Sequence, residues 1–381
     1  MKRTIVIAAL FYAILTPNCV IAQFGLTHSK GYLKELGAIT FNDHADRFQY
    51  DNIIHNRFET TWRLSNKLSL QADLRTRLIS GYSVRNVPGY DSYLEQDAGY
   101  FDLNRNLISN RTHVLNVQSD RLHLSYINNS LEVHIGRQRL NWAKTMVWSP
   151  NDLFNNYAYL DFDYEERPGT DAIHIQYNWS FASSIELGLQ PGKSYDELVL
   201  AAMLRTNINT YDVQFIAGKY RKDLVLGAGW MGYVGNAGFR GEASLFIPET
   251  IDNPFVNVVL GSDYMFSNGL MTTFEVLYNG GNQRQSDNLA QLFEPPTSRD
   301  LFVSEYAYFL NLSKMVSPLI SMSGGLLGAI DEPLHIFIPQ VTYSISNSVD
   351  LLVLMQIATG RLILDRTEMT NSLFIRLKWS F

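Results

Sequence analysis

The strongest constraint on this chain is a two-residue alternation of apolar and polar side chains. Residues 68–78 read Leu-Ser-Leu-Gln-Ala-Asp-Leu-Arg-Thr-Arg-Leu, so the leucines share one face of a strand and the charged side chains share the other. Similar alternation recurs in residues 211–217, 270–278 and 304–312. Strands that cross a membrane at a tilt are about 9–11 residues long and alternate in this way. The pattern therefore predicts an all-β chain whose strands separate lipid from water.

Runs of this kind, bounded by turn residues, define the predicted strands. We predict 18 of them, at residues 30–40, 50–64, 68–81, 112–127, 131–140, 170–178, 182–190, 196–206, 210–220, 223–233, 237–247, 255–266, 269–279, 301–312, 317–328, 333–345, 348–360 and 370–381.

The predicted connections separate into two kinds. If the chain starts on the periplasmic side, the connections after even-numbered strands are short and rich in turn residues, as at 66–67 and 235–236. The long connections all fall on the other side, at 82–111, 141–169, 280–300 and 361–369. Short turns at one end and long loops at the other are typical of bacterial outer-membrane barrels. We expect one transmembrane antiparallel β-barrel of about 18 strands (16–18), with both termini in the periplasm.

The first 22 residues have the features of a secretory signal. Lys2 and Arg3 precede an apolar segment at residues 5–15, which is too short to span a bilayer, and Pro17 follows it. We expect residues 1–22 to be removed on export, which leaves residues 23–381 as the barrel.

The C-terminal strand carries a second targeting feature. Residues 373–381 alternate and end on Phe381, with Trp379 on the same face. An amphipathic last strand with a terminal aromatic residue resembles the signal that the barrel assembly machinery reads. We expect Trp379 and Phe381 to form this assembly signal and to lie in the inner aromatic girdle. The expected partners are this machinery, outer-membrane lipid and a small-molecule solute.

The composition excludes several other classes of protein. Asp and Glu outnumber Lys and Arg by 37 to 31, and no basic run occurs, which argues against nucleic-acid binding. No later apolar run reaches the length of about 18 residues that a transmembrane helix needs. The eight histidines occur in no hydrolase motif, so we expect neither enzyme activity nor a cofactor.

A barrel of about 18 strands is too wide for its side chains to fill, so a water-filled lumen is expected. The residues predicted to line this pore are Arg57, Arg63, Arg75, Arg77, Arg121, Glu242, Glu275 and Glu305. The arginines lie on early strands and the glutamates on late ones, so opposite walls would carry opposite charge and orient dipolar solutes. The alternative is that these side chains are solvated and form ion pairs with one another.

The segment 141–169 is too aromatic for a loop that extends into water. Ser149 and Pro150 resemble the start of a helix, with Ser149 as the cap. We predict a third external loop that folds inward and constricts the pore, and we assign to this constriction Trp142, Trp148, Asp152, Phe154, Asp161, Asp163, Glu165 and Arg167. The alternative is an external lid packed on the rim.

The acidic residues of this segment raise the question of a metal site. Asp161, Asp163 and Glu165 alternate, as oxygen ligands of Ca²⁺ can. The spacing lacks the glycine and the terminal glutamate of a helix-loop-helix calcium site. We therefore expect ion pairs with Arg137, Arg139 or Arg167 and no metal.

The same stretch resembles a known group of proteins. The similarity rests on a Gly-Arg-Gln strand end at 136–138, Asn-Trp at 141–142, Trp-x-Pro-x-Asp-Leu-Phe-Asn at 148–155, Asp-x-Asp-x-Glu-x-Arg-Pro-Gly-x-Asp at 161–171, Gly-Tyr-Leu at 31–33, and residues 52–57. These motifs are similar to a poorly characterised branch of porin-like outer-membrane barrels of Gram-negative bacteria, distantly similar to alginate-export-type barrels. The resemblance covers residues 30–170 and is architectural beyond them. It implies passive or substrate-specific transport and no catalytic residues.

We therefore expect a channel in the outer membrane for small polar or charged solutes, saccharides among them. Two alternatives stay open. One is a non-conducting anchor or assembly component, and the other is a transporter of hydrophobic solutes.

Overall fold

A computed structural model describes residues 25–42, 48–156, 159–160, 169–249, 253–282, 296–363 and 366–381. The expected signal segment 1–22 lies outside these residues, and so do Asp161, Asp163, Glu165 and Arg167 of the expected constriction. In the part of the chain that is described, no helix is long and apolar enough to cross a membrane.

The alternating segments form one antiparallel sheet of 19 strands. The strands are β1 (Leu26–Asn42), β2 (Gln49–Arg63), β3 (Leu68–Gly81), β4 (Asn104–Ser109), β5 (His113–Asn128), β6 (Leu131–Gln138), β7 (Thr170–Ser180), β8 (Ser183–Gln190), β9 (Val199–Ile208), β10 (Tyr211–Tyr220), β11 (Asp223–Val234), β12 (Ala237–Pro248), β13 (Phe255–Met265), β14 (Leu270–Asn279), β15 (Tyr306–Ser317), β16 (Ile320–Ala329), β17 (His335–Ser346), β18 (Val349–Ile363) and β19 (Arg366–Ser380). Three short helices complete the described elements: α2 (Tyr82–Asn86), α3 (Tyr90–Leu94) and the 3₁₀ helix η2 (Tyr195–Glu197).

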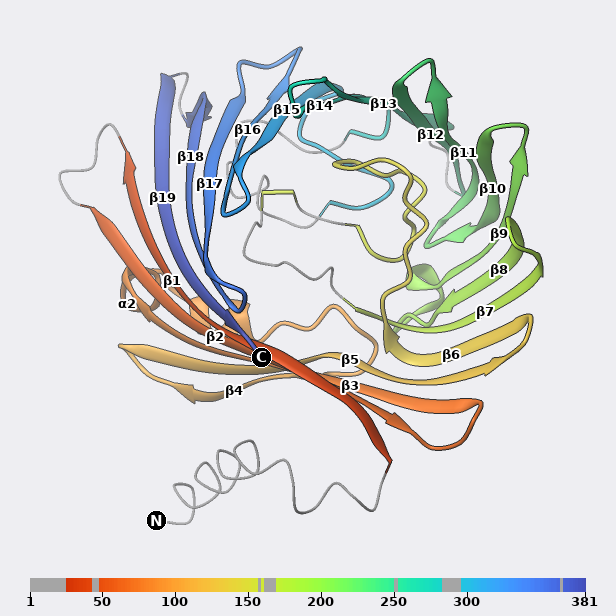
Figure 1. The fold of residues 1–381 in the computed structure, drawn as a ribbon, viewed down its shortest axis with the longest axis horizontal. Helices are drawn as coiled ribbons and strands as arrows, with labels where there is room; N and C mark the ends of the chain where they lie inside the picture. The colour runs from red at the N-terminus through yellow and green to blue at the C-terminus, as the bar shows by residue number, and fades with distance from the viewer. Residues whose placement is uncertain are drawn as a thin grey trace.

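The sheet closes on itself because β1 pairs with both β2 and β19 (Figure 1). Strand β3 pairs with β5, so the closed barrel has 18 strands and β4 is an additional short strand. Strand β4 pairs with residues 114–118 of β5, whereas β6 pairs with residues 122–128. Thus β5 changes its partner on one side halfway along its length.

The prediction of 18 antiparallel strands in a closed barrel is confirmed, and each predicted strand overlaps an observed one. Three details were wrong. Strand β4 was not predicted, and β15 begins at Tyr306 instead of residue 301. The long connection expected at 361–369 is mostly strand, because β18 continues to Ile363 and β19 already begins at Arg366. The pairing of Arg361 with Thr367 extends this hairpin into the region predicted as loop.

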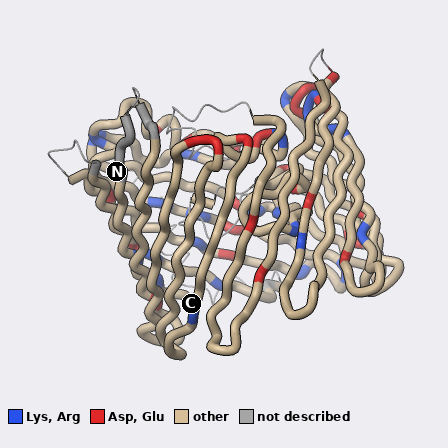
Figure 2. Tube along the Cα trace, turned by 90° about the horizontal axis from the view of Figure 1, so that it is seen from above, with Lys and Arg blue, Asp and Glu red and all other residues tan. Residues whose placement is uncertain are grey.

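The short turns carry residues that accept a left-handed backbone. Asn129 follows β5 with φ 50°, Asn209 follows β9 with φ 58° and Gly235 follows β11 with φ 61°. Asn and Gly adopt this conformation at little cost, which lets two-residue turns match the twist of the strands. These turns, together with the start of β1 and the end of β19, lie at the same end of the barrel, whereas Figure 2 shows acidic residues gathered at the other rim.

The two faces of each strand meet different surroundings. In β3, Asp73, Arg75 and Ile79 are buried inside the barrel, whereas Leu74 between them is exposed on the outside. The outer surface carries many exposed large apolar side chains, of which Leu226, Phe274 and Val353 are examples. A closed barrel satisfies all of its backbone hydrogen bonds internally, and with an apolar exterior it can therefore lie in lipid.

Candidate functional site: the interior of the barrel

The described part of the connection between β6 and β7 runs through the interior of the barrel (Figure 1). We call its described first part, residues 139–156, the inner loop. Its apolar side chains pack on the inner wall in two groups. Trp142 and Phe154 belong to a cluster with side chains of β9 to β12, and Trp148 belongs to another with side chains of β13 to β18. Trp142 and Trp148 are only 2% and 3% exposed, so this packing removes both rings from water.

Glu242 of β12 fixes the middle of the inner loop. Its Oε1 accepts hydrogen bonds from the backbone N–H groups of Lys144 and Thr145, the latter at 2.8 Å. Its Oε2 accepts one from Ser149 Oγ at 2.7 Å and one from the backbone N–H of Asn151 at 3.1 Å. Hydrogen bonds to a carboxylate are stronger than hydrogen bonds between neutral groups. The fully buried side chain of Glu242 therefore anchors the inner loop to the wall at β12.

Glu275 of β14 provides a second anchor next to the first. It accepts the backbone N–H groups of Met146 at 2.6 Å and Val147 at 2.9 Å, one on each oxygen. Its side chain is also 0% exposed. The helix start expected at Ser149 and Pro150 does not form, because the Ser149 hydroxyl binds Glu242 and the backbone makes only a turn there.

A third carboxylate holds the beginning of the inner loop. Glu186 of β8 accepts a hydrogen bond from Trp142 Nε1 at 3.0 Å. The same carboxylate lies 3.1 Å from His174 Nε2 and 3.3 Å from Arg205 Nη2. Trp142 therefore has both a packed ring and a satisfied N–H.

Residues 298–302, in the connection between β14 and β15, contact the inner loop. Ser298 donates a hydrogen bond to the backbone carbonyl of Asp152 at 2.8 Å and accepts one from Asn156 Nδ2 at 2.8 Å. Phe302 meets Trp148 with ring centroids 5.7 Å apart. The described parts of the two long connections therefore contact each other inside the barrel.

The wall formed by β19, β1, β2, β3 and β5 is rich in cations. Its inward-facing cationic side chains are Lys34, Arg57, Arg75, Arg77, Arg121, Arg376 and Lys378. Arg57 is 2% exposed and binds three carboxylates: Glu59 at 2.9 Å, Asp73 at 3.1 Å and Asp120 at 2.5 Å. Among the side chains described on these strands, the seven cations outnumber the inward-facing acids Asp51, Glu59, Asp73 and Asp120.

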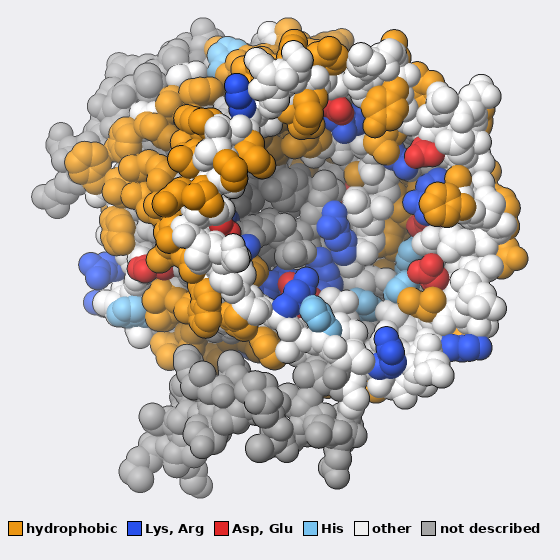
Figure 3. Space-filling model, in the orientation of Figure 1, with side chains coloured by type: hydrophobic (Ala, Val, Ile, Leu, Met, Phe, Trp, Pro, Cys, Tyr) orange, Lys and Arg blue, Asp and Glu red, His pale blue; other side chains and the backbone are white. Residues whose placement is uncertain are grey.

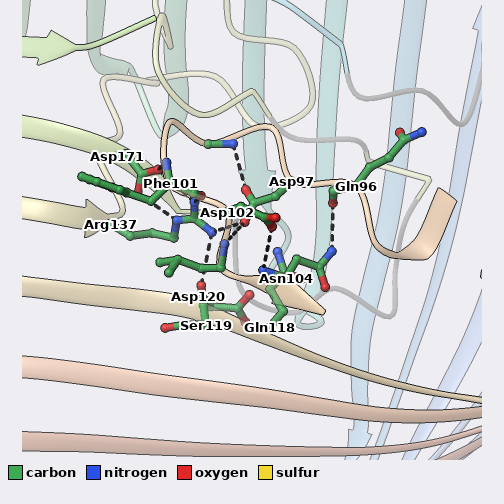
Figure 4. Close-up of polar contacts among 12 residues, drawn as sticks. Gln96, Asp97, Phe101, Asp102, Asn104, Gln118, Ser119, Asp120, Arg137 and Asp171 are labelled. Carbon is green, nitrogen blue, oxygen red and sulfur yellow. Dashed lines mark hydrogen bonds and ion pairs between the residues drawn. The ribbon is translucent and has the colours of Figure 1, made fainter. Parts of the chain in front are cut away.

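Arg137 joins four segments where β5 changes partner (Figure 4). It binds Asp97 at 2.7 Å and Asp171 at 2.9 Å, and it donates to the backbone carbonyl of Phe101 at 2.6 Å. Burial alone would raise the pKa of Asp97, but the Arg137 guanidinium and two backbone N–H groups hold this pKa below its usual range. The cluster ties the connection that carries β4 to β6 and β7.

Similarity to known proteins is found in the structure and not in the sequence. No protein-family model matches the chain, and no curated protein matches it. Among solved structures, Pseudomonas aeruginosa OccK11 (OpdR) is similar with a TM-score of 0.55 at 11% identity over 94% of this chain and 98% of that one. A variant of OccD1 (OprD) gives 0.55 at 10% identity over 94% and 97%. Pseudomonas aeruginosa OccD3 (OpdP) gives 0.54 at 10% identity over 94% and 92%.

The chain has the fold of outer-membrane porins. Identities this low show the fold alone. The porin fold and the apolar exterior together place the chain in the outer membrane.

Within this porin fold the predicted pore-lining residues have different surroundings. Arg57, Arg75 and Arg121 are buried on the basic wall. Arg63 is exposed at the inner end of β2, and Glu305 is exposed at the outer rim just before β15. Glu242 and Glu275 face inward but contact the inner loop instead of water, because its N–H groups take up their oxygens.

The predicted loop and assembly residues are placed as follows. Trp142, Trp148, Asp152 and Phe154 are buried inside the barrel. Trp379 and Phe381 are 50% and 48% exposed on the outer surface, with ring centroids 5.1 Å apart.

Several residues at the centre of these networks were not predicted. Asp120 lies at an irregularity in the pairing of β3 with β5, which the alternation pattern does not reveal. Glu186 has partners that are distant in the sequence, so no local pattern marks it. Arg137 was expected to form an ion pair, but its partners Asp97 and Asp171 were not predicted. Among the described residues, no group of three or more His, Cys, Asp or Glu side chains could hold a metal ion.

Proposed function

We propose that this chain is an outer-membrane channel for small polar or charged solutes and that it favours anions. The observation that supports this proposal is a difference between the two charged walls of the barrel. The glutamates of β12 and β14 accept hydrogen bonds from the inner loop, whereas the described inward-facing cations of the opposite wall outnumber the inward-facing acids of that wall. A lumen lined by one sign of charge concentrates counter-ions and speeds their entry. Figure 3 shows a central hollow with Lys, Arg and His side chains on its visible wall.

The solute class can be narrowed to small carboxylates. A planar carboxylate is bound well by an arginine, which can donate two parallel hydrogen bonds. OpdK, another structure similar to this chain, has been solved with vanillate, an aromatic carboxylate. The sequence resemblance to barrels distantly similar to the alginate-export type favours acidic sugars. We therefore propose that uronates and aromatic carboxylates are candidate solutes.

The experiment is conductance of the purified barrel in planar bilayers. A KCl gradient should give a reversal potential on the anion side, and added glucuronate or benzoate should reduce the chloride current more than glucose does. A cation-selective channel would overturn the preference for anions. The absence of any conductance would instead support the anchor alternative.

A further inference from the structure

Three histidines form a row on the inner wall of the barrel. His123 of β5, His134 of β6 and His174 of β7 each lie beside apolar residues that are exposed on the outer face, so their own side chains point inward. His134 is paired with His174 in the register of β6 and β7, and their rings are stacked, with centroids 5.8 Å apart and an interplanar angle of 16°. The His123 centroid lies 5.9 Å from that of His134. Figure 3, in the orientation of Figure 1, shows histidines beside the central hollow where these strands lie.

The charged groups around this row come from every element packed against it. His174 Nε2 lies 3.1 Å from a Glu186 oxygen, and the other oxygen of Glu186 lies 3.3 Å from Arg205. His134 Nε2 lies 3.8 Å from Glu132. Among the described residues, the charged groups that face the row are Arg121 of β5, Glu132 of β6, Glu186 of β8, Arg205 of β9 and Lys144 of the inner loop.

His134 and His174 each have one ring nitrogen that can bind a ligand. His134 Nδ1 is hydrogen-bonded to Ser125 Oγ at 2.7 Å, and its Nε2 is too far from Glu132 for a hydrogen bond of ordinary length. His174 Nε2 is hydrogen-bonded to Glu186, and its Nδ1 has no such bond to the residues that the structure describes. The side chains of His134 and His174 are 20% and 13% exposed, so both can be reached from the lumen.

His123 differs from the other two members of the row. Its Nδ1 donates to the backbone carbonyl of Arg137 at 3.2 Å. Because this bond holds one ring nitrogen of His123 on the wall, the candidate site consists of the stacked pair His134 and His174.

The charge of this stacked pair depends on pH. Histidine is the side chain whose charge changes between about pH 5 and 8. When both rings are neutral, Glu186 balances Arg205 and Glu132 stays negative, so the wall beside the rings does not attract an anion. Each added proton brings one positive charge to the lumen and makes both nitrogens of that ring donors. Two charged rings so close together repel each other, and an anion bound at their edges offsets this repulsion.

We propose that His134 and His174, with Arg205 beyond Glu186, bind the carboxylate of a solute in acid and release it at alkaline pH. Each charged ring donates one hydrogen bond to the carboxylate, and hydrogen bonds between two charged groups are the stronger kind. The arginines of the basic wall keep their charge at every pH, so they cannot supply this dependence. The inference rests on the proposed function, because it takes small carboxylates as the solutes of the lumen.

Calorimetric titration of the purified barrel with glucuronate tests this site without any need for conductance. A carboxyl group with a pKa of about 4 or below is still ionised at pH 5.5, so a change in affinity reports the protein. The affinity should be about tenfold higher at pH 5.5 than at pH 8, which is the lower end of what one hydrogen bond to a charged group contributes. Proton and anion binding are reciprocal, so titrations at pH 6.5 in buffers of different ionisation enthalpy should show net proton uptake.

A double variant removes both titrating rings and keeps their local hydrogen bonds. His134→Asn leaves a polar group where Nδ1 meets Ser125, and His174→Gln leaves an N–H where Nε2 meets Glu186. The double variant should bind glucuronate at both pH values as weakly as the parent does at pH 8, without proton uptake. The matched control is His335→Gln, since His335 lies on the outer face at the start of β17 and the variant should behave like the parent.

The outcomes separate this site from the proposed transport. Affinity that is the same at pH 8 and pH 5.5, proton uptake that survives in the double variant, or an equal loss in His335→Gln would overturn the site. If the double variant does not form a heat-modifiable barrel, each single variant should still show a smaller pH dependence than the parent, and an undiminished one would overturn the site. A barrel that binds glucuronate with proton uptake but does not conduct would keep the site and overturn the channel.

Discussion

A substitution at Arg77 can test the role of one lumen charge in ion selectivity, because its effect on stability can be measured separately. Arg77 Nη2 donates to Asn116 Oδ1 at 2.9 Å, and the amide of a glutamine also carries N–H donors for this oxygen. Arg77→Gln should therefore weaken anion selectivity at a cost in stability below about 1 kcal/mol. Leu74→Arg, a change on the outer face of the same strand, should cost roughly 2–4 kcal/mol if it lies near the midplane. Reversal potentials and urea titrations of the lipid-inserted protein measure both effects, and equal destabilisation by the two variants would mean that Arg77 does not face water.

The ion pair of Asp97 with Arg137 should make the packing of residues 82–112 on β6 depend on pH. The pKa of Asp97 is lowered in the folded protein, so its contacts stabilise the fold above the unfolded pKa of about 3.9 and are lost as pH falls through the folded value. Protection of the amides in residues 82–112, after correction for the pH dependence of intrinsic exchange, should therefore fall below about pH 4. Asp97→Asn should lower this protection at neutral pH and remove its acid dependence. Asp102→Asn, a change at an exposed acid, is the control. Protection of these amides that does not change with pH in the parent protein would contradict the assignment.

At the scale of elements, two carboxylates determine where the inner loop lies. Glu242→Leu removes the acceptor of several buried N–H and O–H groups, and each donor left unsatisfied costs about 1–3 kcal/mol. The loop should leave the β12 wall, so single-channel conductance should change and added protease should cut near Lys144.

Glu275→Leu should act in the same direction through Met146 and Val147. Ser323→Ala, on an inward-facing position of β16 away from these contacts, serves as the control. Unchanged conductance and protease resistance in both glutamate variants would show that packing alone holds the loop.

The strands could be predicted from the sequence, whereas the contacts of the loops could not. A barrel wall between lipid and lumen imposes a period of two on every strand, which is visible in the sequence of each one. Strand β4 escaped prediction because its pairing depends on β5 changing partner at residues 118–122. The anchors at Glu242 join residues up to 98 positions apart. Such pairs are decided by the folded barrel and leave no local periodicity.

At the scale of the whole molecule, the last residue closes the ring. The backbone N–H of Phe381 donates to Gly31 O and the N–H of Gly31 donates to Phe381 O, both at 2.9 Å. The aromatic side chains of Trp379 and Phe381 point outward. The C-terminus therefore contributes its backbone to barrel closure, and its side chains are available for recognition before the barrel has closed.

Because the backbone closes the barrel and the side chains point outward, the proposed assembly signal can be tested without breaking the hydrogen bonds that close the barrel. Trp379→Ala with Phe381→Ala keeps the backbone hydrogen bonds but removes both rings, so the protein should be exported yet reach the outer membrane poorly. Leu377→Ala, on the same face and 45% exposed, should insert normally. Heat-modifiable protein in the outer-membrane fraction measures insertion, and refolding into pure lipid separates a signal from a structural role. If the double variant refolds as well as the parent in lipid but fails in cells, the rings are read by the assembly machinery. If it fails equally in both, their contribution is to the stability of the barrel at the membrane interface, and the signal lies elsewhere.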